Sequence, residues 1–387
     1  MHVKLIDPSA FTPPYDRALA AALAAEGAEV ELITSDFTYG PVPETKNYEV
    51  SLDFYRHLSP RARRLSKASR HIPEMRQLRN KLEAVPGPMI THYQWLTMPG
   101  IDLHLLSSRR PRVMTAHYIL PQNPSRRQIN RAKETFAPMD AVIAHSVLGA
   151  RRLVDEVGLE REQVQVIPHG AFDYLTSLPV EKPLPPELRE PSPVWEETGT
   201  PRPPVILFFG LLRPYKGIDV LLDAARELAA TDQGTTPEIW IVGNPRMDLA
   251  ELKERAASLE VEVRWLARFI EDAEIPEIMR QADVLVLPYL DGEQSGVLYT
   301  GLAFGKAMVV SEVGGIGEVA RAHGAARLVP PGDAAALGHE LAALTRGEGA
   351  AEAREELAAR CRAAAEGPFA WRRIARQTLD LYEGLLS

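Results

Sequence analysis

The hydrophobic positions in the first half of the chain fall into short β-branched runs, separated by stretches of helical periodicity. Between the first two runs, Tyr15 to Glu26 is rich in Ala and Leu and ends at Gly27, which predicts a helix. This alternation is typical of parallel βαβ units. The runs predict strands at residues 3–7, 29–34, 88–94, 112–117, 140–146 and 164–170.

The second half of the chain repeats this alternation of strand and helix signals after a proline-rich stretch. In residues 183–204, 8 of 22 residues are proline. Because proline removes backbone donors and restricts its neighbours, we interpret this stretch as a linker or surface loop. Beyond it, strands are predicted at residues 205–210, 238–243, 261–266, 283–288 and 307–312, and helices at residues 218–230, 274–281 and 369–386.

The chain of 387 residues is long enough for two domains. We expect an α/β protein with two Rossmann-like, doubly wound domains that face each other across a cleft. The predicted domains are residues 1–182 and 205–368, followed by a helix at residues 369–387. In such sheets, ligands bind at the carboxyl ends of the strands.

The composition is that of an ordinary globular protein, with 45% hydrophobic and 25% charged residues. One cysteine, Cys361, excludes a disulfide scaffold and fits a reducing compartment. No apolar run reaches about 18 residues, and the N-terminus lacks a signal-peptide core, so we expect a cytoplasmic location.

A turn bracketed by glycines, Gly210–Gly217 (GLLRPYKG), follows the strand predicted at residues 205–210 and precedes a helix. Helix N-termini present free N–H groups and a positive dipole end, so Arg213 and Lys216 complete an anion site whose natural ligand is phosphate. We expect both side chains to be exposed. The turn lacks the GxxxxGK[ST] pattern of a Walker loop, and Arg and Lys in a merely solvated loop are the alternative.

A second candidate site, Asp291–Val297 (DGEQSGV), follows the strand predicted at residues 283–288. Glu293 can accept hydrogen bonds from a hydroxyl-rich ligand, and the N–H groups after it can form an anion nest. A further glycine turn, Gly314–Glu318 (GGIGE), closes the next βα unit. In the alternative interpretation, Glu293 only caps the helix that follows.

Residues 208–224 and 293–319 together resemble the retaining glycosyltransferases of family 4, which have the GT-B fold. The family pattern has two glutamates eight positions apart, followed by a Gly-Lys pair. Aligned on Gly305-Lys306, the first glutamate is Glu293, but the second position is Gly301. The second carboxylate usually holds the nucleotide ribose, so the ribose contact is in question.

The resemblance covers nearly the whole chain. Thr115–His117 matches the position whose histidine lines the donor-sugar pocket, and Val166–Gly170 matches a segment at the end of the first domain. The helix that contains Trp371 looks like the one that crosses back to the N-terminal domain. The family often has a Gly-Gly loop after the first strand, whereas this chain has residues 9–16. We therefore expect Pro14, Tyr15 and Asp16 to contact the acceptor more than the phosphates.

The resemblance implies that the catalytic residues are His117, Arg213, Lys216 and Glu293. For Arg268, an exposed arginine beside a core phenylalanine is the alternative. His92 and His145 are interpreted as structural, and His169 as an interdomain positioning residue. The implied nucleotide-sugar-binding residues are Gly210, Arg213, Lys216, Gly243, Arg268, Phe269, Ile270, Glu293, Gln294, Ser295, Gly296 and Val297.

The implied function is transfer of a hexosyl group from a nucleoside diphosphate sugar to a hydroxyl acceptor with retention of configuration (EC 2.4), in glycan or glycoconjugate synthesis. The donor would be a UDP-, GDP- or dTDP-sugar, the acceptor a glycan or lipid-linked molecule. No metal is expected, because no DxD pair or metal-ligand spacing occurs. A nucleotide-sugar epimerase or hydrolase of the same fold, and an inactive nucleotide-sugar-binding protein, are the alternatives. A dehydrogenase would need a GxGxxG fingerprint, which is absent after the first strand.

The net charge of −8 lies entirely in residues 201–387, whereas residues 51–150 hold 16 Lys and Arg against 6 Asp and Glu. In residues 55–82, nine basic residues accompany one acidic residue, and Pro60 and Pro73 are expected to break the segment into short helices. Such basic, partly amphipathic faces lie on anionic membranes, which predicts a peripheral enzyme on the inner face of the plasma membrane. A solvated face and a cradle for a phosphorylated soluble acceptor are the alternatives. Nucleic acid is not expected, because few aromatic residues accompany the arginines.

Overall fold

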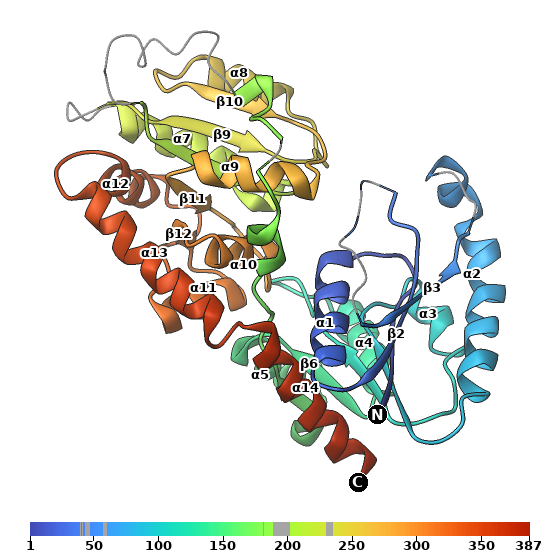
Figure 1. Ribbon diagram of the computed structural model, residues 1–387. Helices are drawn as coiled ribbons and strands as arrows, with labels where there is room; N and C mark the ends of the chain where they lie inside the picture. The colour runs from blue at the N-terminus through green and yellow to red at the C-terminus, as the bar shows by residue number, and fades with distance from the viewer. Residues whose placement is uncertain are drawn as a thin grey trace. The chain divides into compact units, whose positions relative to one another are not determined.

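The chain divides into two compact units in a computed structural model (Figure 1). One unit combines Met1–Gly170 with Pro368–Ser387, and the other is Ala171–Gly367. The structure describes residues 1–38, 40, 42, 47–56, 60–180, 182–188, 202–229 and 235–387, with only the backbone for residues 60–68 and 229.

The first unit is built on a seven-stranded sheet in the order β3-β2-β1-β4-β5-β6-β7. All neighbouring strands pair in parallel. The strands are β1 (His2–Asp7), β2 (Glu29–Ser35), β3 (Glu49–Phe54), β4 (Met89–Tyr93), β5 (Arg112–Thr115), β6 (Ala141–Ala144) and β7 (Val164–Val166). The helices are α1 (Pro13–Ala25), α2 (Pro60–Glu83), α3 (Pro99–Asp102), α4 (Arg126–Phe136), α5 (Val147–Asp155), the 3-10 turn η1 (Arg161–Gln163) and α14 (Trp371–Leu386).

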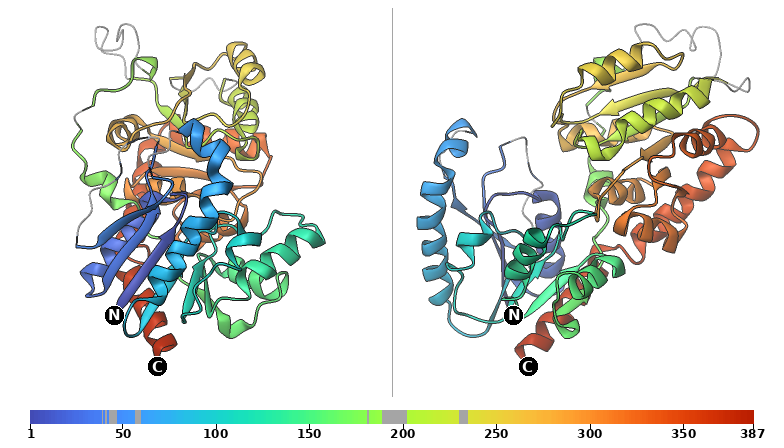
Figure 2. Two further views of the ribbon diagram at one scale, coloured as in Figure 1. Left: turned by 90° about the vertical axis from the view of Figure 1, so that its right-hand side faces the viewer. Right: turned by 180° about the vertical axis from the view of Figure 1, so that it is seen from behind.

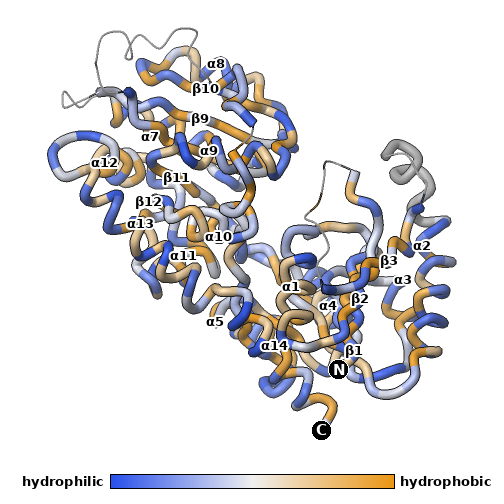
Figure 3. Tube along the Cα trace, in the orientation of Figure 1, coloured by the Kyte–Doolittle hydropathy of each residue, from blue (hydrophilic) through white to orange (hydrophobic). Residues whose placement is uncertain are grey.

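The central strands of this sheet are buried on both faces, as parallel sheets require. Every residue of β4 and of β6 is buried. Hydrophobic residues alternate with hydrophilic ones along α2 (Figure 3). Within its described side chains, Met75, Leu78 and Leu82 join the hydrophobic core of this unit.

The C-terminal helix α14 belongs to the first unit and packs on α1. Its buried stripe includes Trp371, Ile374 and Tyr382. On the exposed side, Arg372 and Arg376 donate hydrogen bonds to the Glu26 carboxylate at 3.0 and 2.9 Å. This confirms the expectation that the last helix returns to the N-terminal domain.

The second unit has a six-stranded parallel sheet in the order β10-β9-β8-β11-β12-β13. Figure 2 shows its helices on both faces of the sheet. The strands are β8 (Val205–Phe209), β9 (Glu238–Val242), β10 (Val263–Leu266), β11 (Val284–Leu287), β12 (Ala307–Ser311) and β13 (Arg327–Val329). The helices are α7 (Ile218–Ala229), α8 (Ala250–Ala257), α9 (Ile275–Gln281), α10 (Gly296–Ala303), α11 (Gly314–His323), α12 (Ala334–Thr345) and α13 (Ala350–Glu366), with the 3-10 turns η2 (Asp173–Ser177), η3 (Pro186–Leu188), η4 (Pro214–Lys216) and η5 (Asp272–Glu274).

The two parallel α/β sheets confirm the predicted fold class. All eleven predicted strands are present. The sequence analysis missed β3, at the edge of its sheet, and β13, which has three residues. In the proline-rich stretch, residues 189–201 lie outside the described part, and η3 before them contacts β10.

The expectation that prolines break residues 55–82 into short helices is wrong. One helix, α2, begins at Pro60 and continues through Pro73. Proline is favourable in a first helical turn but costs a hydrogen bond inside a helix. The buried residues on both sides of Pro73, His71 and Met75, anchor the helix to the core and outweigh that loss. Among the described residues, no helix combines the length and apolar character that a bilayer crossing requires.

Candidate functional site

Three glycines bring the carboxyl ends of β8, β9 and β11 into close contact. A Cβ on Gly243 would lie 1.6 Å from the Gly210 carbonyl oxygen, and one on Gly217 would lie 1.9 Å from the Pro288 carbonyl oxygen. Both glycines have positive φ, 147° and 69°. Only glycine allows this approach. The predicted ligand positions Gly210 and Gly243 therefore form one glycine-lined edge.

Lys216 lies at this edge and is buried, contrary to expectation. It is the last residue of η4 and is 8% exposed. The ammonium Nζ donates to the Tyr289 hydroxyl at 2.9 Å and lies 4.6 Å from the centre of the Tyr289 ring. The Tyr289 hydroxyl is in turn 3.1 Å from Ser295 Oγ. This places a fixed positive charge beside Gly210, whose Cβ position is 3.4 Å from Nζ.

Arg213, three residues earlier, is exposed as expected. Its backbone is extended (φ −134°, ψ 153°), and Pro214 begins η4 directly after it. Helix α7 then begins at Ile218. The two cations differ in environment, because Lys216 is held by Tyr289 whereas Arg213 is surrounded by solvent.

Glu293 lies in the turn before α10, which begins at Gly296. The turn is packed against the next glycine turn, because a Cβ on Gly314 would lie 2.2 Å from the Gly292 carbonyl oxygen. The N-cap residue of α10 is Ser295, so Glu293 is not its N-cap. Ser295 and Val297 are buried, while Gln294 accepts a hydrogen bond from the Tyr299 hydroxyl at 3.3 Å.

Gly301 faces the sheet from the middle of α10. A Cβ there would lie 2.5 Å from Met308 Sδ on β12 and 2.8 Å from Leu285 Cδ2 on β11. A glutamate at this position would therefore displace core side chains. The departure from the family pattern coincides with close packing of α10 on the sheet.

Arg268, predicted to bind the nucleotide sugar, is paired with a carboxylate. Its two Nη atoms donate to Glu274 at 2.6 and 2.9 Å. This bidentate pair lowers the pKa of Glu274. Phe269 is half-buried and Ile270 is buried. The Arg268 side chain would have to leave Glu274 to bind an anion, so this segment offers mainly its backbone and Phe269.

In the first unit, the segment from Ser9 to Thr12, called loop 1 below, follows β1 and is held by a buried carboxyl pair. Asp7 accepts hydrogen bonds from the N–H groups of Ser9, Phe11 and Thr12 at 3.2, 2.5 and 3.2 Å. Asp16 lies beside Asp7, and burial together with the Asp7 charge raises its pKa well above the usual value. A neutral Asp16 beside an ionised Asp7 is the state these contacts favour.

The predicted acceptor residues Tyr15 and Asp16 are buried, whereas Pro14 is half-buried. The Tyr15 ring packs edge-on against the His117 ring, with centroids 4.8 Å apart. These two residues therefore meet in the structure. Tyr15 and Asp16 support loop 1 from within, and Pro14 retains more exposed surface.

His117 is half-buried at the carboxyl end of β5. Trp95 stacks on its ring (5.2 Å between centroids, 13° between planes), and Gln94 Oε1 lies 3.1 Å from His117 Nε2. Burial, reinforced by neighbouring histidines, lowers the pKa of His117 well below its usual value. A neutral imidazole can both donate and accept, which suits a hydroxyl-bearing ligand.

The other histidines of this edge are buried. His92 lies between the Tyr382 hydroxyl (2.6 Å from Nδ1) and Thr115 Oγ1 (2.8 Å from Nε2), as a structural residue should. Burial lowers the pKa of His92 to about 3 and that of His145 to about 4. His169 packs on Tyr15 and on Trp371 of α14.

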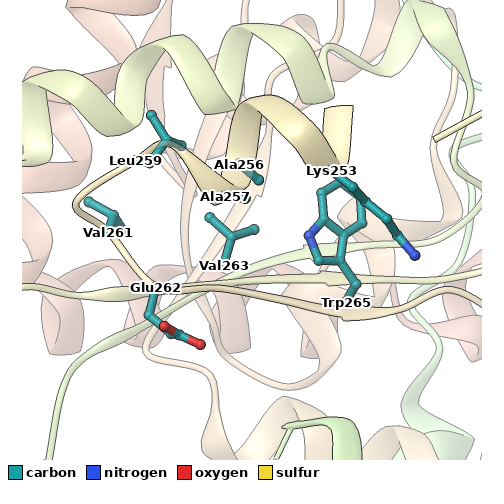
Figure 4. A pocket seen from close by; sticks show the side chains of 8 residues that line it. All are labelled: Lys253, Ala256, Ala257, Leu259, Val261, Glu262, Val263 and Trp265. Carbon is teal, nitrogen blue, oxygen red and sulfur yellow. The ribbon is translucent and has the colours of Figure 1, made fainter. Parts of the chain in front are cut away.

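Two cavities of about 350 Å³ lie in the described part of the chain. One is beside loop 1 and is lined by Asp16, Arg17 and Thr34 among others. The other lies between α8 and β10, where the Lys253 ammonium approaches the Trp265 ring (Figure 4). No predicted site residue lines the second cavity.

Sequence reasoning missed four residues that shape these edges. Asp7 ends β1, Gln94 and Trp95 follow β4, and Tyr289 follows β11 after one proline. The signal that could have found them is position, because each is a polar or aromatic residue at the carboxyl end of a parallel strand.

Two family models match the chain: "Glycosyltransferase Family 4" over residues 17–171 and "Glycosyl transferases group 1" over residues 203–346. A D-inositol 3-phosphate glycosyltransferase of Nocardia farcinica is 27% identical over 80% of this chain and 69% of that protein. A phosphatidyl-myo-inositol mannosyltransferase of Mycobacterium leprae is 34% identical over 46% of each chain. The chain thus spans less than half of the second relative.

Solved structures share the fold of the whole chain at low sequence identity. Sucrose-phosphate synthase from Thermosynechococcus elongatus matches with a TM-score of 0.73 and 20% identity, over 100% of this chain and 99% of that one. Anabaena HepE, solved in complex with UDP-glucose, matches with a TM-score of 0.71 and 18% identity over 100% of both chains.

Proposed function

The chain belongs to glycosyltransferase family 4, the retaining enzymes that use nucleotide sugars, and we propose that it glycosylates a hydroxyl group of a glycolipid or related glycan. The observation that carries the proposal is the Lys216 ammonium fixed by Tyr289 beside the glycine-lined edge of β8 and β9. A buried cation next to a glycine-lined strand edge is suited to a diphosphate.

The diphosphate gains negative charge as the bond to the sugar breaks. Pre-organised donors stabilise such charge best because they need not reorient during the reaction. We assign this role to Lys216, Arg213 and the first N–H groups of α10 at Gly296 and Val297. Lys216 is the pre-organised member of the set, since Tyr289 already holds its ammonium group.

We assign binding of the sugar hydroxyls and of the base to other predicted site residues. In the proposal, Glu293 and Gln294 accept hydrogen bonds from the hydroxyls, and neutral His117 hydrogen-bonds the transferred sugar. Phe269 and the backbone of residues 268–270 flank the base. Because Arg268 is paired with Glu274, it orders this segment.

We assign the acceptor to residues 1–182, of which residues 1–170 belong to the first unit, and the nucleotide sugar to residues 205–368. Relatives named for inositol phosphate, phosphatidylinositol and glycolipid acceptors support a lipid-linked or phosphorylated polyol acceptor. The cavity beside loop 1 supports the placement, since Asp16 and Arg17 line it.

Helix α2 supports a peripheral association with anionic membranes. Arg70, Arg76 and Arg79 are exposed on its described part. Such an enzyme would meet a lipid acceptor at the inner face of the plasma membrane, where basic residues are attracted to anionic lipids.

A thermal-shift panel with UDP-glucose, GDP-mannose and dTDP-glucose tests the donor site. A ligand at about 100 times its Kd stabilises a protein by about 2.7 kcal/mol. The donor that raises Tm is then offered with D-inositol 3-phosphate or phosphatidylinositol vesicles. Conversion of the nucleotide sugar at an equal rate without any acceptor would contradict the transferase assignment and indicate a hydrolase or epimerase.

Replacement of Arg213 tests its assigned role in stabilising the leaving diphosphate. Arg213→Ala is expected to reduce turnover by about two orders of magnitude, as loss of one transition-state contact does, without a change in Tm. Arg226→Ala, on the exposed side of α7, is the matched control and should keep wild-type turnover. Near wild-type activity of Arg213→Ala would remove this loop from the leaving-group site.

A further inference from the structure

A buried hydrogen-bonded chain links helix α2 to the carboxyl edge of the first sheet. His71 Nε2 on α2 is 2.6 Å from Asp102 Oδ1 on α3, and His71 Nδ1 is 2.6 Å from the Tyr55 hydroxyl after β3. His71 and Asp102 have no exposed surface, and Tyr55 is 2% exposed. If the imidazole is neutral, His71 donates to Asp102 and accepts from Tyr55.

Both ends of this chain reach segments at the ligand edge. The Tyr55 hydroxyl hydrogen-bonds with Ser9 of loop 1 and Thr97 after β4, and these two hydroxyl oxygens are 2.7 Å apart. At the other end, Asp102 Oδ2 accepts from the Met98 N–H at 2.8 Å. The same chain therefore holds loop 1 and residues 94–98.

These two segments also contact each other and His117. The Trp95 indole N–H donates to Thr12 Oγ1 at 2.9 Å, and the Trp95 ring stacks on His117. Gln94 is hydrogen-bonded to His117. Movement of residues 94–98 would therefore move the partners of His117 and one wall of loop 1 together.

Where Tyr55 meets loop 1, the backbone on both sides is held in a conformation that L-residues rarely adopt. Tyr55 has φ 53°, and Ala10 in loop 1 has φ 48°. Such conformations persist only where the surroundings determine them, and they collect at functional sites. A core needing only stability would be served as well by apolar residues, since buried polar groups must recover their desolvation cost.

We propose that Tyr55, His71 and Asp102 are positioning residues of the transfer reaction, which hold loop 1 and residues 94–98 in register with His117. The inference rests on the proposed function, because it assigns a reaction to this edge. The three residues act through hydrogen bonds to the two segments and contact neither substrate.

Amide hydrogen exchange tests the positioning without any substrate. Tyr55→Phe removes one hydroxyl and keeps the ring. We expect exchange about three- to tenfold faster in residues 9–12 and 94–98, the effect of losing one hydrogen bond. Thr135→Val is the matched control in the same unit, because among the described residues its buried hydroxyl bonds only to the Arg131 carbonyl within α4. It should leave both segments unchanged.

Thr97→Val removes the hydroxyl that bonds to Ser9 at the same end of the chain, and it serves if Tyr55→Phe folds poorly. It should release loop 1 to a similar extent. Wild-type exchange in both segments, or faster exchange confined to α2 and β3, would overturn the proposal, because a purely structural tyrosine predicts the latter.

Kinetics provide the second readout. With UDP-glucose or GDP-mannose as donor and phosphatidylinositol vesicles as acceptor, kcat for transfer in Tyr55→Phe should fall at least about tenfold, because misplaced groups lose alignment. Donor KM should stay near the wild-type level, because the diphosphate site around Lys216 is untouched. If kcat for transfer is unchanged, or if donor KM rises as much as kcat falls, the proposal fails. An inactive wild type would contradict the proposed function instead, while the exchange result would still stand.

Discussion

Gly301 has no room for a side chain, because Met308 and Leu285 occupy the position of its Cβ. Gly301→Ala should therefore lower the free energy of unfolding by about 1–3 kcal/mol, the usual cost of overpacking a core. Gly384→Ala is the matched control, since Gly384 also lies in a helix but has open space around it. There, alanine should stabilise by up to about 1 kcal/mol.

Urea denaturation of both variants measures the difference. A Gly301→Ala protein as stable as the wild type would mean that α10 can move away from the sheet. In that event, close packing would not explain why the second glutamate of the family pattern is absent here.

The carboxyl pair of Asp7 and Asp16 gives a pH dependence with a defined sign. Asp16 has a raised pKa in the folded state and an ordinary value of 3.8 otherwise. At pH values between the unfolded-state and the folded-state pKa of Asp16, the folded protein keeps a proton that the unfolded chain has released. The free energy of unfolding therefore falls as pH rises through this range. Asp16→Asn imitates the neutral acid and should gain stability relative to the wild type as pH rises from about 4, reaching a constant difference above the folded-state pKa.

Thermal unfolding at a series of pH values between 4 and 8 checks this expectation. Asp380→Asn replaces an exposed carboxylate on α14 and is the control. A pH-dependent gain of equal size in the control, or none in Asp16→Asn, would show that the pair does not share a proton as assigned.

Much of the candidate site could be predicted from the sequence, because glycine turns and strand ends leave local signals. Gly210, Gly217 and Glu293 lie at strand-to-helix turns as expected. The burial of Lys216 could not be predicted, since it depends on Tyr289, 73 residues away. The Glu274 partner of Arg268 is near in sequence, but which of several acidic residues it would choose is decided by the fold.

Helix α14 depends on a histidine that must stay neutral. His92 binds the Tyr382 hydroxyl of α14, and burial lowers its pKa from 6.5 to about 3. Below about pH 6.5, the unfolded chain takes up a proton that folded His92 does not, so stability falls as pH decreases. Each such histidine contributes up to about 1.4 kcal/mol per pH unit in that window.

His92→Gln should therefore flatten the acid side of the stability profile by the contribution of one histidine. Unfolding measured from pH 7 down to pH 4 checks it, with His104→Gln as the control because His104 is exposed. Equal acid slopes in wild type and His92→Gln would contradict the assignment. This pH dependence is opposite in sign to that of Asp16. The two variants therefore distinguish the contribution of His92 to stability from that of Asp16.

Hydrophobic periodicity predicted most elements, and the errors have physical causes. The alternation of Val50, Leu52 and Phe54 in β3 is a strand signal, but an edge strand with half-buried positions makes it weak. In α2, local proline chemistry predicted a break, whereas burial of His71 and Met75 by the rest of the unit decided the outcome. Non-local packing overrides local preference here.

Charge is unevenly distributed along the chain, and this limits how the first unit can contact a membrane. Residues 201–387 carry the net negative charge, and the basic surplus lies in residues 51–150. In the described part of α2, the apolar residues Met75, Leu78 and Leu82 face the protein core. That face is therefore unavailable for insertion into a bilayer, and any membrane contact of this part must be electrostatic.

Liposome co-sedimentation tests that contact. Binding should require anionic lipid and weaken steeply as salt rises, because exposed charges are screened over about 8 Å at physiological ionic strength. It should fall when Arg61, Arg63 and Arg64 become glutamate, since each basic residue near the surface contributes about 1 kcal/mol. The side chains of these three residues lie outside the described part. The control makes the same charge change at Arg126, Arg127 and Arg131, which are exposed on α4 of the same unit. Equal loss of binding in the control would indicate a diffuse charge effect. Equal partition to neutral vesicles would contradict membrane binding through α2 and favour the alternative that its basic face binds a phosphorylated soluble acceptor.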